Sequence, residues 1–425
     1  MCRPQSKDGL RTNMRILFIL TYYRPHVSGL TIYVERLAKA LAARGHSVTV
    51  LTSHYAKDLP YEETVDGVRI VRAPVAFRFN KGVFMLSFPF VAWREIRAHD
   101  VVSIHLPQVE AALAAFLTRL AGRRPILTYH CDLQMPPVWY GKIVDSLTFW
   151  DNLLAGKLAD TIVTYTEDFA QHSPFLSRFL GKESRIADEA VRRQGDQETA
   201  AGSPVTSSPC HPKLRVILPP VVIPDPTPEG VRALRDRVGL NGQKVIGFAA
   251  RFAYEKGAGY LINAIPHILQ EIPDIRILFA GPYGKEVIGE TIWYDMQPLI
   301  RRYGPYLTFL GTLNPSQMAD FFAACDVVTV ASINNTESFG LVQVEAFMCG
   351  TPVVAADLPG VRQPVIMTGM GEIVPVADAE GLARWIVKVL RNRDRYVKPR
   401  AEIMRMFELA RTVDEYEKLF EAKRS

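Results

Sequence analysis

The chain has 425 residues, a length that predicts two or three domains. Apolar residues make up 48% and charged residues 22% of it, which is typical of globular proteins and argues against a disordered or fibrous one. The net charge of +6 is too small to indicate a nucleic-acid-binding protein, but it suits an acidic surface or a phosphorylated ligand. We therefore expect no nucleic-acid partner.

Cysteine usage and hydropathy indicate where the protein works. The five cysteines include no C-x-x-C pair, so we expect free thiols in a reducing cytosol, without a disulfide framework or a zinc site. No apolar run reaches the roughly eighteen residues that span a membrane, and the polar N-terminus lacks the apolar core of a signal peptide. These features predict a cytoplasmic protein without a spanning helix.

The first half of the chain alternates strand-like and helix-like segments. Short apolar runs predict buried strands at 15–20, 47–53, 100–106, 125–130 and 160–165. Helical spacing predicts helices at 33–46, which ends at the helix stop Gly45, and near 107–121 and 145–158. Buried strands separated by helices predict a doubly wound parallel α/β sheet.

A second series follows a break in this pattern. Residues 182–212 are polar and rich in Gly, Ser and Pro, which predicts a disordered insertion without an activity of its own. Strand-like runs then resume at 244–250, 275–281, 306–311, 326–332 and 352–358. We therefore predict two Rossmann-like domains, at 14–220 and 221–400, and a helix within 401–425 that packs back toward the first domain. The carboxyl ends of their strands are the expected ligand site.

Two cations follow the first strand of the second half. Arg251 lies at the strand end, and Lys256 comes shortly before Gly257 and a helix. Cations beside a helix N-terminus form a site for a diphosphate. The alternative is a solvated basic loop.

The apolar segment 341–349, LVQVEAFMC, contains Glu345, and a second carboxylate, Glu337, precedes it. A buried carboxylate without a partner costs several kcal/mol, so we expect Glu345 to bind something in the cleft. Carboxylates accept hydrogen bonds from vicinal hydroxyls, as on a ribose or a hexose. Gly340 lets the N–H groups of the following helix approach an anion or a sugar. The alternative is that Glu345 pairs with a structural arginine.

Taken together, these segments resemble the retaining family-4 glycosyltransferases of the GT-B fold. Glu337-Ser-Phe-Gly followed by Glu345 looks like their E-x7-E signature, and Arg251 with Glu255-Lys256-Gly257 resembles their R…EKG segment. Residues 22–52 are similar to their opening loop and first helix, with Ser28-Gly29 in place of two glycines. The resemblance covers the chain outside 182–212. It implies an acceptor-binding first domain and a nucleotide-sugar-binding second domain that face a central cleft.

The resemblance implies a role for each matching residue of the second half. Arg251 and Lys256 would hold the donor diphosphate and take part in catalysis. Glu337, also a catalytic candidate, would bind the donor sugar, and Glu345 the ribose. Backbone N–H groups for the donor would come from Phe339, Gly340 and Leu341.

In the first half the resemblance is carried by fewer residues. His130, in 128-TYHCDL-133, matches a strand-end histidine that lies over the donor sugar, and we expect it to be catalytic. Asp132 beside it is a candidate for the acceptor site, and Gly29 for close approach to the donor. A lone histidine can also be structural, which is our interpretation of His105.

The chemistry implied is transfer from a UDP- or GDP-linked sugar with retention of the anomeric configuration. The leaving phosphate would accept the acceptor's proton. We find no convincing Asp-x-Asp pair at a strand end, so we expect no cofactor and no metal, with Arg and Lys stabilising the leaving diphosphate.

The expected acceptor is a glycan or a lipid-linked saccharide used in cell-surface polysaccharide or glycolipid synthesis. Residues 76–100 combine aromatic residues with Arg78, Lys81, Arg94 and Arg97, which suits a shallow contact with an anionic inner membrane surface. The alternative is packing between domains. Trp139 and Tyr140 are candidates for a sugar-stacking lip.

Other functions on the same fold are a sugar-nucleotide epimerase, a phosphorylase and a non-catalytic nucleotide-sugar-binding protein. Glu337 together with His130 argues against the pure binding protein, which needs no such pair. A nicotinamide dehydrogenase is disfavoured because no G-x-G-x-x-G follows the first strand.

Overall fold

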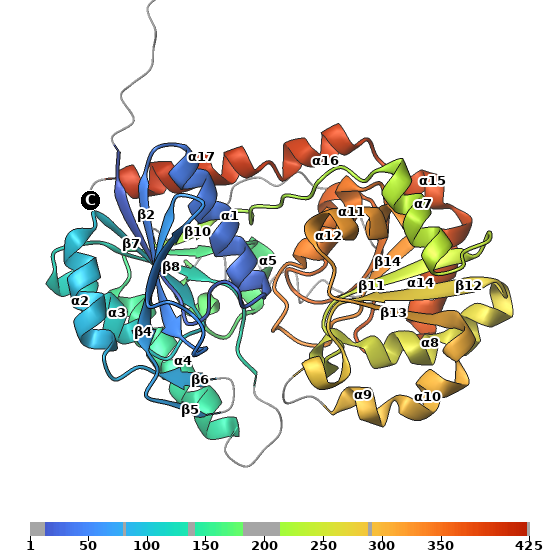
Figure 1. The fold of residues 1–425 in the computed structure, drawn as a ribbon, viewed down its shortest axis with the longest axis horizontal. Coiled ribbons are helices and arrows are strands. Elements are labelled where there is room, and N and C mark those ends of the chain that lie inside the picture. The colour runs from blue at the N-terminus through green and yellow to red at the C-terminus, as the bar shows by residue number, and fades with distance from the viewer. Residues whose placement is uncertain (1–12, 80–81, 135–140, 182–212, 288–290, 423–425) are drawn as a thin grey trace, which may run out of the picture. The chain divides into compact units, whose positions relative to one another are not determined.

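A computed structural model describes residues 13–79, 82–134, 141–181, 213–287 and 291–422 (Figure 1). Its contacts divide the chain into two units that interleave along the sequence. Unit 1 comprises Met1–Tyr129, Ser146–Val163 and Val413–Ser425, and unit 2 comprises His130–Asp145 and Thr164–Thr412. The expected insertion at 182–212 and three residues singled out above, Lys81, Trp139 and Tyr140, lie outside the described residues. The domain limits 14–220 and 221–400 remain predictions.

The first sheet has the strand order β10-β9-β8-β7-β1-β2-β4-β3. Neighbouring strands from β9 to β4 pair in parallel, whereas β3 pairs with β4 in the antiparallel sense. The strands are β1 Arg15–Ile19, β2 Ser47–His54, β3 Glu62–Val65, β4 Val68–Pro74, β7 Val101–Leu106, β8 Pro125–Tyr129, β9 Thr161–Thr164 and β10 Leu214–Val216.

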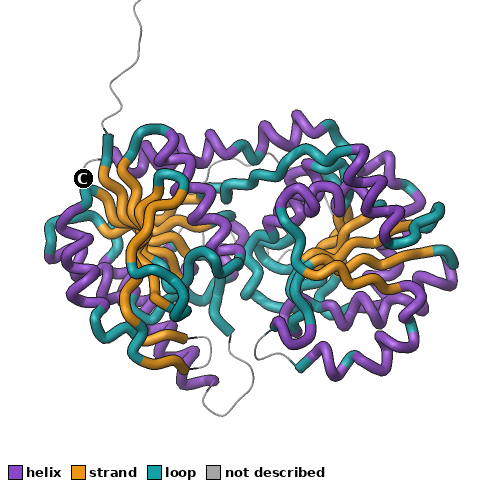
Figure 2. Tube along the Cα trace, viewed as in Figure 1, coloured by secondary structure: helices purple, strands orange, loops and turns teal. Residues whose placement is uncertain are grey.

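Helices cover both faces of this sheet. They are α1 Gly29–Ala43, α2 Phe88–Ala98, α3 Ala111–Leu120, α4 Gly141–Leu158 and α5 Glu167–His172. The connections β7–α3–β8 and β8–α4–β9 step toward the same edge, while β1–α1–β2 steps the other way. Because crossovers between parallel strands are right-handed, α3 and α4 share one face of the sheet and α1 covers the opposite face (Figure 2).

The C-terminal helix α17 Leu409–Glu421 is tied to unit 1 from Val413 onward. The hydroxyl of Tyr416 lies 2.6 Å from that of Tyr33 and 3.0 Å from that of Thr128. Burial raises the pKa of Tyr416 to about 12, so this phenol stays neutral. Arg44, the C-cap residue of α1, adds an ion pair with Glu417 at 2.7 Å. The hydroxyl network and the ion pair hold α17 against α1 and the end of β8.

The second sheet has the strand order β13-β12-β11-β14-β15-β16, and its strand pairs are parallel. The strands are β11 Lys244–Ala249, β12 Ile275–Ala280, β13 Leu307–Gly311, β14 Val327–Val330, β15 Val353–Ala356 and β16 Gly371–Val374. The helices are α7 Pro228–Arg237, α8 Ala258–Glu271, α9 Ile292–Asp295, α10 Gln297–Arg302, α11 Pro315–Ala324, α12 Leu341–Met348, α13 Gln363–Thr368, α14 Ala379–Arg391, α15 Arg393–Tyr396 and α16 Arg400–Met406. The two doubly wound sheets confirm the predicted fold class.

The order of the second sheet indicates where a ligand is expected to bind. Strands β11, β12 and β13 progress toward one edge, and β14, β15 and β16 toward the other. The direction in which successive strands are added to the sheet therefore reverses between β11 and β14, although the two strands are parallel. Loops that leave the carboxyl ends of two such strands diverge and open a crevice, which is where ligands of open α/β sheets bind.

The segment 76–100 forms a hairpin and a helix. Strands β5 Phe77–Phe79 and β6 Gly82–Phe84 are antiparallel, and the rings of Phe77 and Phe84 stack with centroids 4.5 Å apart. Helix α2 begins with Phe88, which is only 2% exposed, whereas Phe90 is 80% exposed. Phe88 was one of the aromatic residues expected to be able to enter a membrane surface, and this is wrong for Phe88 because its ring belongs to the core.

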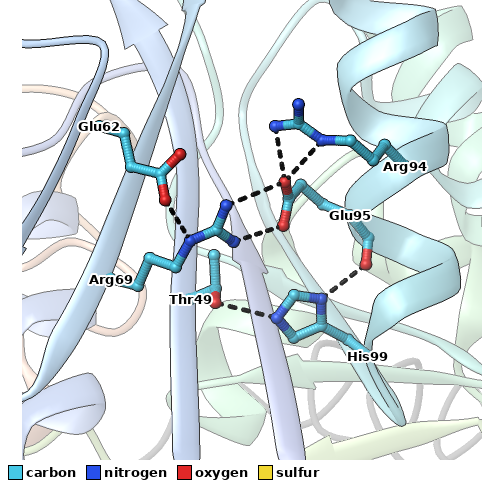
Figure 3. Close-up of polar contacts among 6 residues, drawn as sticks. All are labelled: Thr49, Glu62, Arg69, Arg94, Glu95 and His99. Carbon is cyan, nitrogen blue, oxygen red and sulfur yellow. Dashed lines mark hydrogen bonds and ion pairs between the residues drawn. The ribbon is translucent and has the colours of Figure 1, made fainter.

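A polar cluster fastens α2 to the sheet (Figure 3). The Glu95 carboxylate, on the buried face of α2, accepts hydrogen bonds from Arg69 of β4 at 2.7 Å and from Arg94 at 2.8 Å. His99 lies 2.6 Å from the backbone oxygen of Glu95 and 2.9 Å from the Thr49 hydroxyl of β2. Burial lowers the pKa of His99, which favours the neutral ring. The cluster is buried beneath α2 and partly open where the arginines reach the surface.

Candidate active site

Two charged side chains meet at the switch between β11 and β14. Lys256 ends a short 3-10 turn, Tyr254–Lys256, after β11, and Glu337 lies in the loop that leads from β14 to α12. The Lys256 Nζ is 2.5 Å from Glu337 Oε2. The other oxygen of Glu337 accepts a hydrogen bond from the Gly340 N–H at 3.0 Å. Both side chains are about one-fifth exposed, so their charges lie in a partly desolvated setting.

Two glycines permit this close approach. Gly257 has a φ of +72°, and a Cβ there would lie 1.8 Å from the Ala331 carbonyl oxygen. The neighbouring Ile333 N–H donates to the Glu255 carbonyl at 3.0 Å, so the two loops touch backbone to backbone. Gly340 has a φ of +75° and is the N-cap residue of α12. A side chain at Gly257 would separate Lys256 from Glu337.

Arg251 lies two residues after the end of β11 and pairs with Glu255 at 2.5 Å. Its side chain is more exposed than that of Lys256. The structure therefore places both expected cations in one loop, each beside a carboxylate of its own. Of the two, Lys256 lies nearer the crevice because its partner Glu337 comes from the neighbouring strand's loop.

Helix α12 corrects one expectation. Glu345 lies in its second turn and is half-buried, so the prediction of a buried carboxylate is wrong. The fully buried polar side chain of this helix is Gln343, whose amide donates to the carbonyls of Phe339 at 3.1 Å and Val361 at 2.8 Å. Leu341 is the first helical residue, and Phe339 just before it is buried.

Within unit 2, the residues that follow β8 contact the loop that carries Glu337. His130 is buried, and its carbonyl accepts a hydrogen bond from the Ser338 hydroxyl. The Asp132 N–H donates to the Asn335 carbonyl at 3.2 Å. His130 and Asp132 therefore belong to the same unit as Lys256 and Glu337 and lie beside the loop that carries Glu337. The structure thus brings His130 and Asp132, predicted from the first half, beside the loop of Glu337, predicted from the second.

Two side chains that sequence analysis missed support His130 and Asp132. The Tyr165 hydroxyl contacts His130 Nδ1, and the Ser173 hydroxyl donates to Asp132 Oδ1 at 2.7 Å.

A separate ion pair joins α5 to the loop after β15. The Arg362 guanidinium binds Asp168 at 2.5 Å, and the Gly360 N–H donates to the same carboxylate at 2.8 Å. Burial works to raise the pKa of Asp168, but the bonds from Arg362 and Gly360 outweigh it and lower that pKa.

Unit 1 presents an aromatic cluster at the carboxyl ends of β1 and β2. The rings of Tyr22 and His26 stack with centroids 4.8 Å apart, and Tyr55 lies edge-on to Tyr22 at 5.4 Å. The His26 N–H donates to the Tyr55 hydroxyl at 2.7 Å. Such a cluster can stack on the ring of a sugar or a polyol. The available sequence signal was the pair Tyr22-Tyr23, shortly after the first strand.

Two further expected residues lie in unit 1. Gly29 is exposed at the start of α1, next to the cap residue Ser28, whose hydroxyl accepts from the Thr31 N–H at 3.2 Å. A Cβ on Gly29 would meet nothing within 4 Å of the described chain. His105 is completely buried, and burial lowers its pKa to about 3. A neutral ring in the core supports our interpretation of His105 as structural.

Two further observations concern the described residues as a whole. Among the residues that the structure describes, no group of three or more His, Cys, Asp or Glu side chains is placed to hold a metal ion. The described helices include none with the length and apolar character needed to cross a bilayer.

Comparison with known proteins identifies the family. Residues 28–178 match the model of the glycosyl transferase 4-like domain, and residues 231–405 match that of glycosyl transferases group 1. The phosphatidyl-myo-inositol mannosyltransferase of Mycobacterium leprae is 26% identical over 96% of each chain. The D-inositol 3-phosphate glycosyltransferase of Segniliparus rotundus is 30% identical, over 85% of this chain and 76% of its own.

Solved structures share the fold. Anabaena Alr3699/HepE, in complex with UDP and glucose, superposes with a TM-score of 0.68 and 18% identity over 96% of this chain and all of that one. Sucrose-phosphate synthase from Thermosynechococcus elongatus gives a TM-score of 0.69, again with 18% identity, over 96% of this chain and 98% of its own. From the family matches and this shared architecture, the chain belongs to the family-4 glycosyltransferases of the GT-B fold.

Proposed function

We propose that this glycosyltransferase moves a hexosyl group from a UDP- or GDP-linked sugar to a hydroxyl of a polyol or saccharide headgroup on a membrane lipid. The transfer retains the anomeric configuration and needs no metal. The observation that carries the proposal is the meeting of Lys256, Glu337 and the Gly340 N–H at the switch point of the second sheet. It is further supported by the relatives named for inositol-containing acceptors and by a structural neighbour that holds UDP and glucose.

On the donor side, the charges suit a diphosphate leaving group. Breaking the bond from the sugar C1 to the phosphate oxygen leaves the electron pair on the diphosphate, and Lys256 with Arg251 stabilises that charge. Glu337 orients the sugar hydroxyls, and Glu345 binds the ribose. The acceptor oxygen forms its bond to C1 on the face that the diphosphate leaves. The acceptor's proton goes to the departing phosphate oxygen.

On the acceptor side, we assign the headgroup ring to the aromatic cluster of Tyr22, His26 and Tyr55. Stacking suits a polyol or sugar ring because the C–H faces of such rings are apolar while their hydroxyls point outward. The Arg78 charge is felt at Tyr22, where it works to lower a pKa that burial raises overall. A cation near the cluster suits an acceptor that carries a phosphate.

The test is a transfer assay with purified protein. A thermal-shift screen of UDP- and GDP-sugars selects the donor, and the labelled donor is then offered to inositol phospholipid in detergent micelles. We expect labelled lipid, with product and donor sharing one anomeric configuration by NMR, and an unchanged rate in excess EDTA. Loss of activity in EDTA that magnesium or manganese restores would overturn metal independence. Formation of an epimerised nucleotide sugar would point to the epimerase alternative.

Two variants separate donor from acceptor recognition. We expect Glu345→Gln to weaken nucleotide affinity roughly tenfold, because an amide is a poorer acceptor for the two ribose hydroxyls, with little change in melting temperature. Tyr22→Ala is expected to raise the acceptor KM and leave nucleotide affinity unchanged. Isothermal titration and initial rates measure both. A large loss of melting temperature in Glu345→Gln at unchanged nucleotide affinity would make Glu345 a structural residue.

A further inference from the structure

Two neighbouring helices of unit 1 carry apolar side chains on their outer faces. On α3 these are Leu113, Phe116 and Leu120, and on α4 they are Leu147, Trp150 and Leu154. Both sets are spaced by three and then four residues, so each forms one stripe along its helix. All six side chains are exposed, and Trp150 is 61% exposed. A helix with apolar residues on its outer as well as its inner face requires a second partner.

The two stripes lie side by side. The Ala112 N–H at the start of α3 donates to Asp151 of α4 at 3.4 Å, and Arg119 near the end of α3 donates to the Leu158 carbonyl at 2.6 Å. The helices therefore run in the same direction, with Trp150 and Leu154 level with the first turns of α3. Both cover the same face of the sheet, so their exposed sides point the same way. The six residues form one apolar surface, which we call the α3–α4 face.

The exposed apolar residues of α3 do not contribute to the packing of this helix on the sheet. The buried positions of α3 are alanines and a threonine, which bring the helix close to the sheet: Ala111, Ala112, Ala114, Ala115 and Thr118. Scattered exposed apolar residues are common, but a continuous surface over two helices marks an interaction site.

Charge decides between partners. In the described parts of 86–129 and 146–160, the exposed charged residues are Arg94, Arg97, Lys157 and Asp100. Asp100 is paired with Arg15 at 2.7 Å and Arg94 with Glu95 at 2.8 Å, so the excess positive charge around the α3–α4 face comes from Arg97 and Lys157. A second copy of the chain would bring these cations together, whereas an anionic lipid surface complements them.

We propose that the α3–α4 face binds an anionic bilayer surface, with its apolar side chains at the boundary between headgroups and acyl chains. The proposal rests on the proposed function, since a lipid acceptor requires the enzyme to work at a membrane. It moves the apolar part of the contact from the aromatic residues of 76–100, of which Phe88 is buried, to α3 and α4. Arg97 on α2 and Lys157 on α4 supply the electrostatic part of the binding.

The experiment is vesicle flotation of the full chain. The vesicles contain phosphatidylcholine alone or with phosphatidylglycerol in equal parts. We expect binding to the anionic vesicles that weakens with added salt. The triple variant Phe116→Ser, Trp150→Ser, Leu154→Ser should bind at least about tenfold more weakly. The matched control is Ile366→Ser with Met404→Ser, which removes exposed apolar side chains from unit 2 and should bind like the wild type.

Transfer in detergent micelles and analytical ultracentrifugation distinguish membrane binding by the α3–α4 face from the transferase proposal and from dimer formation. The triple variant should transfer sugar to acceptor in detergent micelles at the wild-type rate, so a failure of the α3–α4 face and a failure of the transferase proposal give different results. If the triple variant melts early, Trp150→Ser alone replaces it and should still bind more weakly. Unchanged vesicle binding in a folded variant overturns the proposal. So does a wild-type dimer in analytical ultracentrifugation that the variant abolishes without any vesicle binding, because the occupant is then a second copy.

Discussion

We expect Lys256→Ala to lower kcat for sugar transfer by about two to three orders of magnitude, with the fold intact. A preorganised donor aimed at a developing oxyanion contributes about 2.7–4 kcal/mol to lowering the barrier. Lys256 is held in place by Glu337 at 2.5 Å and by a loop fixed to the end of β14, so its position needs no reorganisation during the reaction. Initial rates at saturating donor measure the effect.

Two variants control this result. Lys244→Ala removes a lysine from the opposite end of the same strand, where the ion pair with Asp326 spans 3.9 Å, and should leave kcat unchanged. Glu337→Gln removes the partner but keeps the ammonium group, so its kcat should fall less than that of Lys256→Ala if Lys256 stabilises the leaving group. Near-normal kcat in Lys256→Ala would refute the diphosphate role. If Lys256→Ala instead lowers the melting temperature so far that the variant is unfolded at the assay temperature, the Lys256–Glu337 pair is structural.

Hydrophobic runs predicted most of the strands, because strands buried on both faces are continuously apolar. The runs at 15–20 and 244–250 coincide with β1 and β11 within about one residue. Strand β3, Glu62–Val65, was not predicted because it is short, polar and largely exposed at the sheet edge. Strand order also could not be predicted, since it depends on which apolar faces pack together and not on the pattern within one strand.

Some residues of the candidate site could be predicted from the sequence and others could not. Lys256 and Glu337 were singled out from local spacing and a family resemblance, and the structure places them in contact. Tyr165 and Ser173 lacked any sequence signal, because their contacts with His130 and Asp132 span 35 and 41 residues of chain. Glu345 was expected to be buried because its neighbours are apolar. In helix α12, however, the buried face passes through Gln343, Val344 and Phe347, and Glu345 falls at its edge.

The second large effect concerns stability, at Glu95. This residue is 2% exposed and accepts hydrogen bonds from two arginines (Figure 3). The side chains of both arginines are partly exposed. Removing one partner of a fully buried ion pair costs about 3–5 kcal/mol. Because Arg69 is about one-third exposed and Arg94 is 64% exposed, both can rehydrate, and we expect Glu95→Ala to cost about 2 kcal/mol. For a unit of this size that corresponds to a fall of about 4–8 °C in Tm.

The pH dependence makes this prediction sharper. Burial works to raise the pKa of Glu95, but the hydrogen bonds from Arg69 and Arg94 outweigh it, so the pKa is lowered in the folded chain. A carboxyl whose pKa is lower when folded adds stability above its unfolded pKa, and that stability is lost as pH falls through the folded value. The Tm difference between wild type and Glu95→Gln should therefore be largest at neutral pH and shrink below about pH 4. Glu62→Ala, which removes the exposed partner of Arg69, is the matched control and should lower Tm by no more than about 2 °C. A Tm difference that does not depend on pH would show that Glu95 stabilises α2 by packing and not by charge.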